Sequence, residues 1–384
     1  MSTGATNQSP SAVQHIVFIA HRLEGGIGAN IVRLSESLVK LGNRVSVWLE
    51  DIPQANVQRK LTHVKLRYLK TTHPVGGVIF FIALALEDKP DIIVTSVERT
   101  TRLAINSVKL IPKKPRIFAC VHNFYSQHFN SLKPDKKAKR INRLSLNYPN
   151  IEGVIFVSNS VKNDFVNLIG NSNFKNRIIY NPVHSYPPSI NHNTNPFNGK
   201  PRDGLPTILY IGRLVKQKNI PFLLDCFKTL LEHKPCQLVL VGEGPERRAM
   251  EQYCQHLGIS DWVEFTGLKD DPRPYLEAAD VMAVTSLYEG FGNVIIESLY
   301  CGTPVVATAC GGPNEILTEM KFGKVVPQGA LHEFVDWLLY YIEHKPDPLE
   351  LKRYAIRNFS SEKIALQYLD FFTEKLTEPV KEIG

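Results

Sequence analysis

Short β-branched segments alternate with helical segments through both halves of this chain, and that alternation restricts the possible fold more than any other feature. The strand pattern recurs at residues 15–20, 45–49, 92–95, 117–121 and 153–157, and again at residues 207–212, 238–244 and 303–308. A helical period at residues 30–41 fills the first interval. Strands that alternate with helices favour parallel sheets covered by helices on both faces. We therefore predict an α/β fold with doubly wound sheets.

The chain is long enough for two such units. It has 384 residues, of which 43% are hydrophobic, and this is ample for two buried cores. Residues 186–205 are rich in Pro, Asn and Gly and have no apolar period, so we interpret them as a linker. The predicted units are residues 1–185 and residues 206–358, followed by a strongly apolar helical segment at residues 359–384.

A glycine-rich turn in the second unit has the chemistry of a phosphate site. The turn Gly-Phe-Gly-Asn lies between Glu289 and Glu297, which are eight positions apart. A helix that begins near Asn293 and ends before Gly302 would direct unpaired amides, at the positive end of its dipole, towards a bound diphosphate. Glu297 would lie about one turn, roughly 6 Å, into the helix and accept hydrogen bonds from ligand hydroxyls. Glu289 would reach the other end of the ligand.

A second turn, Gly311-Gly312-Pro313, repeats this arrangement after the predicted strand at residues 303–308. We expect both helix starts to face one ligand. Acidic residues at this spacing also occur by chance, and the alternative is a pair of exposed carboxylates. The apolar neighbours of Glu297 leave little solvent-facing surface on the helix, so burial of this side chain without a partner would be costly.

Two basic residues follow a predicted strand of the second unit. Arg213 comes directly after residues 207–212, and Lys218 lies five residues later. In an open parallel sheet, ligands bind beyond the carboxyl ends of the strands. Arg grips phosphate oxygens bidentately and Lys supplies a compact charge, so this pair suits a leaving diphosphate. Solvated surface residues are the alternative, and we favour phosphate binding because of the glycine-rich turn.

The first unit contains the turn Gly25-Gly26-Ile27-Gly28. Ile31 occupies the position of the third glycine in a G-x-G-x-x-G dinucleotide fingerprint, so an oxidoreductase is disfavoured. His122 directly follows the strand at residues 117–121, at the sheet edge where active sites form. A structural histidine is the common alternative at such a position, and we keep His122 as a candidate hydrogen-bonding partner or proton carrier.

Residues 212–317 resemble the donor half of the retaining family 4 glycosyltransferases, also described as glycosyl transferases group 1. The resemblance rests on GRLVKQKN, VGEGP, VEFTG, the Glu-x7-Glu motif and GGPNEIL, which occur in the family's order. Such enzymes have the GT-B fold, in which two Rossmann-like domains face a cleft. The resemblance implies that residues 1–185 bind the acceptor, that residues 206–358 bind a nucleotide-sugar, and that the helix within residues 359–384 crosses back to the first domain.

The resemblance also implies roles for individual residues. Arg213 and Lys218 would bind the donor diphosphate, Glu297 the ribose, and the backbone near residues 266–268 the base. The first glycine-rich loop would help to place the donor phosphates or the acceptor. The expected catalytic residues are His122, Arg213, Lys218 and Glu289. The expected donor-binding residues are Gly26, Gly28, Gly212, Arg213, Lys218, Gly267, Leu268, Glu289, Gly290, Phe291, Gly292, Asn293, Val294 and Glu297.

Positive charge is concentrated in one short region. The net charge is +8, and six basic residues against Asp135 give residues 133–143 an excess of five. The six are Lys133, Lys136, Lys137, Lys139, Arg140 and Arg143. Ile141, Leu144 and Tyr148 recur beside them at helical spacing, which suits docking on an anionic inner membrane surface; a solvated cationic helix is the alternative. No nucleic-acid motif accompanies the charge, so nucleic acid is not an expected partner.

Other features favour a protein with reduced cysteines that associates with the membrane only peripherally. No apolar run reaches the roughly 20 residues that span a bilayer. The first fourteen residues have no apolar signal core, so we expect a cytoplasmic protein that associates peripherally with the membrane. The six cysteines lack paired ligand spacing and are interpreted as reduced, mostly structural thiols. No Asp-x-Asp pair is present to clamp a metal, so we expect neither a metal nor a cofactor.

The predicted activity is retaining transfer of a sugar from a UDP- or GDP-linked donor to a lipid-linked saccharide or glycolipid in surface polysaccharide or lipopolysaccharide synthesis. Retention is implied by the family resemblance alone. A nucleotide-sugar 2-epimerase of the same fold is one alternative, and it would need the donor only. A non-catalytic sugar- or lipid-binding module is another, and it would release no nucleoside diphosphate.

Overall fold

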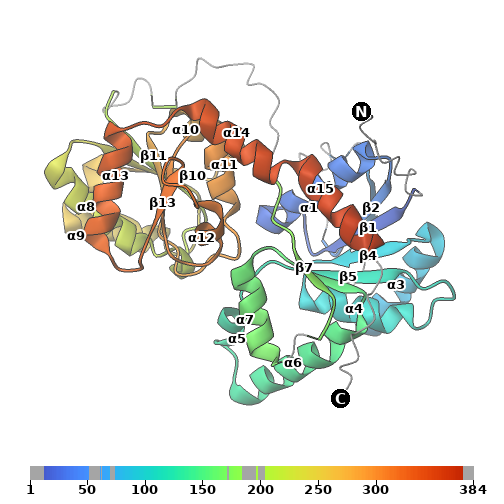
Figure 1. Ribbon diagram of the computed structural model, residues 1–384. Helices are drawn as coiled ribbons and strands as arrows, with labels where there is room; N and C mark the ends of the chain where they lie inside the picture. Colours follow the sequence, from blue (N-terminus) through green and yellow to red (C-terminus); the bar gives the residue numbers. More distant parts are fainter. Residues whose placement is uncertain are drawn as a thin grey trace, which may run out of the picture.

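The computed structural model describes residues 13–51, 61, 63–69, 74–170, 173–183, 196–197 and 204–374. It contains two α/β lobes, each with one parallel sheet between layers of helices (Figure 1). The predicted α/β class with two doubly wound sheets is confirmed. The predicted linker at residues 186–205 lies almost entirely outside the described residues, so its boundaries stay a prediction.

The first lobe is built on a seven-stranded sheet with the order β3-β2-β1-β4-β5-β6-β7. All its strand pairings are parallel. The strands are β1 (His15–Ala20), β2 (Arg44–Leu49), β3 (Lys65–Tyr68), β4 (Ile92–Thr95), β5 (Arg116–Val121), β6 (Gly153–Phe156) and β7 (Asn176–Ile178). The helices are α1 (Gly25–Lys40), α3 (Pro74–Asp88), α4 (Glu98–Val108), α5 (Tyr125–Phe129), α6 (Pro134–Asn147) and α7 (Asn159–Ile169), and η1 (Tyr148–Asn150) is a short 3-10 helix.

The second lobe is built on a six-stranded parallel sheet with the order β10-β9-β8-β11-β12-β13. Its strands are β8 (Thr207–Ile211), β9 (Gln237–Val241), β10 (Val263–Gly267), β11 (Val281–Val284), β12 (Val305–Thr308) and β13 (Gly323–Val326). Its helices are α8 (Ile220–His233), α9 (Arg247–Leu257), α10 (Arg273–Ala278), α11 (Asn293–Cys301), α12 (Gly312–Ile316), α13 (Leu331–Glu343) and α14 (Pro348–Phe359), and η2 (Lys216–Lys218) and η3 (Ser260–Trp262) are 3-10 helices.

The predicted strands form because their apolar runs can be buried on both sides. All six residues of β1 and all five of β9 are buried, as expected for central strands of a parallel sheet. The edge strand β3 has only half-buried or exposed side chains, which is why its sequence, Lys-Leu-Arg-Tyr, gave no strand signal. Helix α1 begins at Gly25 rather than at residue 30, so the first glycine-rich turn forms the start of the helix itself.

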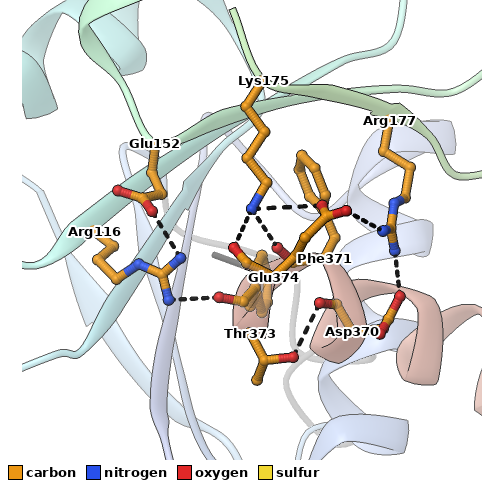
Figure 2. Close-up of polar contacts among 9 residues, drawn as sticks. Arg116, Glu152, Lys175, Arg177, Asp370, Phe371, Thr373 and Glu374 are labelled. Carbon is orange, nitrogen blue, oxygen red and sulfur yellow. Dashed lines mark hydrogen bonds and ion pairs between the residues drawn. The ribbon is translucent and has the colours of Figure 1, made fainter. Parts of the chain in front are cut away.

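The chain returns to the first lobe at its C-terminal end. Ser360 caps α15 (Ser361–Thr373) and forms an isolated β-bridge with Val183. Helix α15 then packs against α1 in the first lobe (Figure 1). Its last turn is fixed by basic residues of β5 and the β7 region (Figure 2). Arg116 and Lys175 donate to the backbone carbonyls of Phe372 and Phe371 at 2.5 and 3.2 Å.

The basic helix α6 differs from the prediction in one respect. Leu144 and Tyr148 are fully buried in the core of the first lobe, and Tyr148 packs on Phe165 at a ring distance of 4.7 Å. The apolar side of α6 therefore faces the protein core, and the expectation that it faces a lipid surface is wrong. Lys133, Lys136 and Lys139 remain exposed to solvent.

All six cysteines are free thiols, in agreement with the sequence. Within the described ranges, no helix combines the length and apolar character that crossing a bilayer requires.

Candidate active site

The predicted glycine turn and helix of the second lobe form as expected. Helix α11 spans Asn293–Cys301, and Gly292 before it has φ +100°, a conformation that favours glycine. Gly302 ends the helix in the left-handed conformation. The free amides of the first turn and the side chain of Glu297 therefore lie on one short, rigid element.

Glu289 lies on the loop before this turn and is held by two side chains of the same lobe. Lys218, at the end of η2, forms an ion pair with Glu289 Oε1. Ser286 Oγ donates to the same oxygen at 2.9 Å. The carboxylate is mostly buried, so the ammonium and the hydroxyl together offset its desolvation.

The second glycine turn does not face the ligand site, so that expectation is wrong. The Gly312 amide donates to the Glu289 carbonyl at 3.0 Å, and Glu289 and Gly311 form a β-bridge. A Cβ atom on Gly312 would lie 2.0 Å from the carbonyl oxygen of Phe291. Glycine is needed here because the second turn packs directly beneath the first one and supports it.

Glu297 is held from the other lobe. Arg33 of α1 donates from Nη2 to Glu297 Oε1 at 2.6 Å and from Nη1 to the Pro182 carbonyl at 3.2 Å. The side chains of Arg33 and Glu297 are only 9% and 15% exposed. One turn away on the same two helices, Asn293 Nδ2 donates to Asn30 Oδ1 at 3.1 Å. These contacts join α1 to α11 across the two lobes.

A cavity of about 860 Å³ lies between these elements, within the size range of small-molecule sites. Residues of both lobes line it, and most of the predicted site residues are among them. These are Gly26, His122, Gly212, Arg213, Lys218, Glu289, Gly290, Phe291, Gly292, Asn293, Val294 and Glu297. Both motif carboxylates and both predicted phosphate-binding bases therefore converge on one space.

Three predicted donor-binding residues do not line this cavity. A Cβ atom on Gly28 would lie 2.1 Å from the Leu23 carbonyl oxygen, so this glycine permits close packing at the start of α1. Gly267 ends β10, and Leu268 is 77% exposed. Asp270 and Asp271, which follow after Lys269, do line the cavity. Base contacts from residues 266–268 stay a prediction.

His122 directly follows β5 and lines the cavity from the first lobe. Both ring nitrogens are buried and have no hydrogen-bond partner among the described residues. This burial lowers the pKa of His122 to about 4, so the ring is neutral near pH 7. A Cβ atom on Gly290 would lie 2.0 Å from the His122 carbonyl oxygen, so the backbones of the two lobes can pack closely beside this histidine only because residue 290 is glycine.

A second cavity of about 530 Å³ shares His122, Arg213 and Gly290 with the first. Its remaining lining comes mostly from the first lobe and is aromatic and basic, with one carboxylate. Those residues include Glu98, Arg99, Phe124, Tyr125, His128, Arg140 and Tyr288. His122 therefore lies where two spaces meet, and each is large enough for a sugar-sized ligand.

Two residues of the site had no signal in the sequence. Arg33 and Asn181 come from segments without a motif, and they reach the second lobe only through tertiary folding. Asn181 donates to Asn293 Oδ1 at 2.8 Å. An arginine on the predicted buried face of a helix is the one sign that could have marked Arg33, because such a charge requires a partner. Within the described residues, no group of His, Cys, Asp and Glu is arranged to hold a metal ion.

Comparison with known proteins finds a matching protein family for each lobe. The family described as glycosyltransferase family 4 matches residues 24–185, and the family described as glycosyl transferases group 1 matches residues 191–358. An uncharacterized glycosyltransferase of Methanocaldococcus jannaschii is 27% identical over 77% of this chain and 80% of its own length. A lipopolysaccharide core biosynthesis glycosyltransferase of Rhizobium meliloti, LpsE, is 36% identical over 34% of this chain and 37% of its own length.

Solved structures share the fold along the whole chain. Anabaena HepE in complex with UDP and glucose superposes with a TM-score of 0.77 at 19% identity and covers 94% of this chain and 99% of its own. The lipopolysaccharide outer core galactosyltransferase WaaB superposes with a TM-score of 0.70 at 20% identity, over 93% and 99% of the two chains. The chain therefore belongs to the glycosyltransferases of group 1 and family 4, and it has the GT-B fold.

Proposed function

We propose that this glycosyltransferase is a retaining hexosyltransferase that takes its sugar from a UDP- or GDP-linked donor. The observation that carries the proposal is the convergence of Arg213, Lys218, Glu289 and Glu297 on one cavity that also receives the start of α11. A nucleoside diphosphate has two anionic phosphoryl groups and a ribose with two hydroxyls. Its phosphates match the bases and amides, and its hydroxyls match a carboxylate acceptor.

The transfer step needs charge stabilisation where the donor breaks. The bond between the anomeric carbon and the diphosphate oxygen breaks, a new bond forms from that carbon to an acceptor hydroxyl, and the hydroxyl proton passes to the departing diphosphate. Arg213 is exposed and lines the cavity, and its guanidinium forms no hydrogen bond or ion pair with the described residues, so it is available to the phosphates. With Lys218 and the α11 amides it would stabilise the leaving group without a metal ion.

We assign His122 a role beside the reacting sugar. A neutral imidazole with both nitrogens unpaired can donate one hydrogen bond and accept another. Its place at the junction of the two cavities fits contact with the donor sugar or the acceptor hydroxyl. Replacing His122 with Ala should therefore reduce turnover, and full turnover by that variant would remove the assignment.

The second cavity favours a transferase over an epimerase, because an epimerase needs no acceptor space. We propose that it holds a lipid-linked saccharide or glycolipid of surface polysaccharide or lipopolysaccharide synthesis. Relatives named for lipopolysaccharide core synthesis and for Vi polysaccharide synthesis support this acceptor class. The exposed Lys133, Lys136 and Lys139 of the α6 region would bring the chain to an anionic inner membrane surface by charge alone.

The test is a transfer assay with purified protein, UDP- and GDP-sugars and a lipid-linked acceptor fraction. Release of nucleoside diphosphate that requires the acceptor, together with a product that keeps the donor's anomeric configuration by NMR, is the expected result. An epimer formed from the donor alone would instead identify an epimerase. Donor binding without any release of nucleoside diphosphate would identify a binding module.

A further inference from the structure

We infer that Arg33, a residue of the first lobe, is a positioning residue for the donor nucleoside, which binds mainly to the second lobe. The inference rests on the proposed function, because it concerns the carboxylate assigned there to the ribose. Its starting observation is the contact between Arg33 Nη2 and Glu297 Oε1 at 2.6 Å.

The contact fixes the carboxylate and leaves part of it available. Arg33 binds Oε1 of Glu297, and no described residue forms a hydrogen bond or ion pair with Oε2. Glu297 and Arg33 both line the 860 Å³ cavity. A carboxylate oxygen that is aligned by a guanidinium in this way is ready to accept hydrogen bonds from vicinal ribose hydroxyls. Arg33 therefore reduces the ordering that nucleoside binding would otherwise require.

The surroundings of Arg33 make it rigid. Its other nitrogen donates to the Pro182 carbonyl, at the end of the first lobe and one residue before the β-bridge between Val183 and Ser360. The Asn30–Asn293 and Asn181–Asn293 contacts lie one helical turn away. The Arg33 guanidinium is thus bound both to Pro182, where the described chain leaves the first lobe, and to Glu297 of the second lobe. The affinity for the nucleoside should therefore depend on how the two lobes are positioned relative to each other.

Burial of the Glu297 carboxylate is costly without Arg33, so removal of Arg33 should change how Glu297 behaves. A mostly buried carboxylate without a cation is poorly solvated and takes up a proton or reorients towards water. Glu297 would then be a weaker acceptor for ribose hydroxyls. In the proposed site, groups other than Glu297 would bind the phosphates and the base, so the loss should appear only for ligands that carry the ribose hydroxyls.

The experiment is calorimetric titration of UDP and GDP, and of the 2′,3′-dideoxy form of the nucleotide that binds more tightly. The proteins are wild type, Arg33→Met, Arg33→Lys and the matched control Arg44→Met, whose exposed side chain lies at the amino end of β2 and does not line the cavity. Thermal unfolding of each variant reports whether it is folded. Arg33→Lys keeps the charge and provides the second test if Arg33→Met does not fold.

We expect Arg33→Met to weaken nucleotide binding roughly tenfold, which is the loss of one charge-assisted contact. Arg33→Lys should lose less, and Arg44→Met should bind as wild type does. The dideoxy nucleotide should bind wild type and Arg33→Met equally. Unchanged nucleotide affinity in Arg33→Met, or an equal loss for the dideoxy form, would overturn the role of Arg33 alone. Failure of wild type to bind either UDP or GDP would overturn the proposed function and this inference with it.

Discussion

The two carboxylates of the Glu-x7-Glu motif are each paired with one cation, but the cations come from different lobes. Glu289 is bound by Lys218 and Ser286, which belong to the same lobe. Glu297, eight positions later, is bound by Arg33 from the other lobe. Both pairs are mostly buried and both line the same cavity. The first pair forms when one lobe folds, whereas the second also requires that the two lobes meet.

In the proposed function, the two carboxylates have different roles. The Lys218–Glu289 pair is complete within the second lobe, so it would present a preorganised charge arrangement to the diphosphate and sugar independently of the first lobe. The Arg33–Glu297 pair joins the two lobes, so ribose binding would depend on the contact between them. This division would allow the donor to bind before water, the competing acceptor, is excluded.

The largest effect is expected from breaking the pair within one lobe. Lys218→Met removes both the cation at Glu289 and a charge at the leaving diphosphate, so kcat/KM for transfer should fall by roughly 10²- to 10³-fold. Steady-state kinetics with the preferred donor measures this. The control is Lys216→Met, on the same 3-10 helix but exposed and outside the cavity. If kcat/KM fell less in Lys218→Met than in Arg33→Met, the Arg33–Glu297 pair would matter more for transfer than the Lys218–Glu289 pair.

His122, at the junction between the lobes, should make the folding stability depend on pH. The unfolded chain protonates His122 below about pH 6.5, whereas burial lowers the pKa in the folded protein to about 4. Stability is therefore complete above pH 6.5 and decreases as the pH falls from 6.5 towards 4. Between pH 7 and pH 5, wild type should lose about 2 kcal/mol more than His122→Asn. Urea unfolding at the two pH values tests this, and equal losses would show that the ring is not buried.

A second contact across the lobes serves as a comparison without a ligand role. Glu315 of α12 accepts hydrogen bonds from the backbone amides of Asn159 and Ser160 at 2.9 and 3.0 Å, so it caps α7 of the other lobe. Glu315→Ala should lower stability by about 1 kcal/mol and leave nucleotide affinity unchanged. Thermal unfolding and calorimetry measure the two quantities, with Glu319→Ala as the exposed control. Weaker nucleotide binding in Glu315→Ala would mean that any interlobe contact affects the nucleoside, and that Arg33 has no special role.

No effect is expected from metal removal. The proposed leaving-group stabilisation uses Arg213, Lys218 and the α11 amides, so transfer should continue at an unchanged rate in excess EDTA. Loss of transfer that magnesium restores would show that these groups are insufficient, and the assignment of Lys218 would have to change.

The local parts of this site could be predicted from sequence, because their partners are close in the chain or announced by a turn. Gly292 and Gly302 delimit α11 through backbone conformations that favour glycine, and the apolar runs of the central strands specify burial on both faces. Lys218 and Glu289 were predicted for the same site from separate motifs. The start of α1 was predicted at residue 30 instead of Gly25, because its glycine-rich first turn does not show a helical apolar period.

The parts that depend on long-range packing could not be predicted. Nothing near Arg33 specifies that it meets Glu297, which is 264 positions away. The Gly311-Gly312 turn has the same local signature as the Gly290 turn, yet it supports that turn from below because Phe291 lies against it. The apolar positions beside the basic residues of α6, including Leu144 and Tyr148, were predicted correctly. That they face the protein core depends on Phe165 and its neighbours, which the local sequence does not specify.

We propose above all that a nucleotide-sugar binds in the cavity between Arg213, Lys218 and Glu297. A crystal structure with bound UDP or GDP is the decisive test. We expect a diphosphate within hydrogen-bond distance of Arg213, Lys218 and the α11 amides, with ribose hydroxyls on Glu297 and with Arg33 still in contact with that carboxylate. A nucleotide bound elsewhere, or a diphosphate that neither basic residue contacts, would refute the proposal.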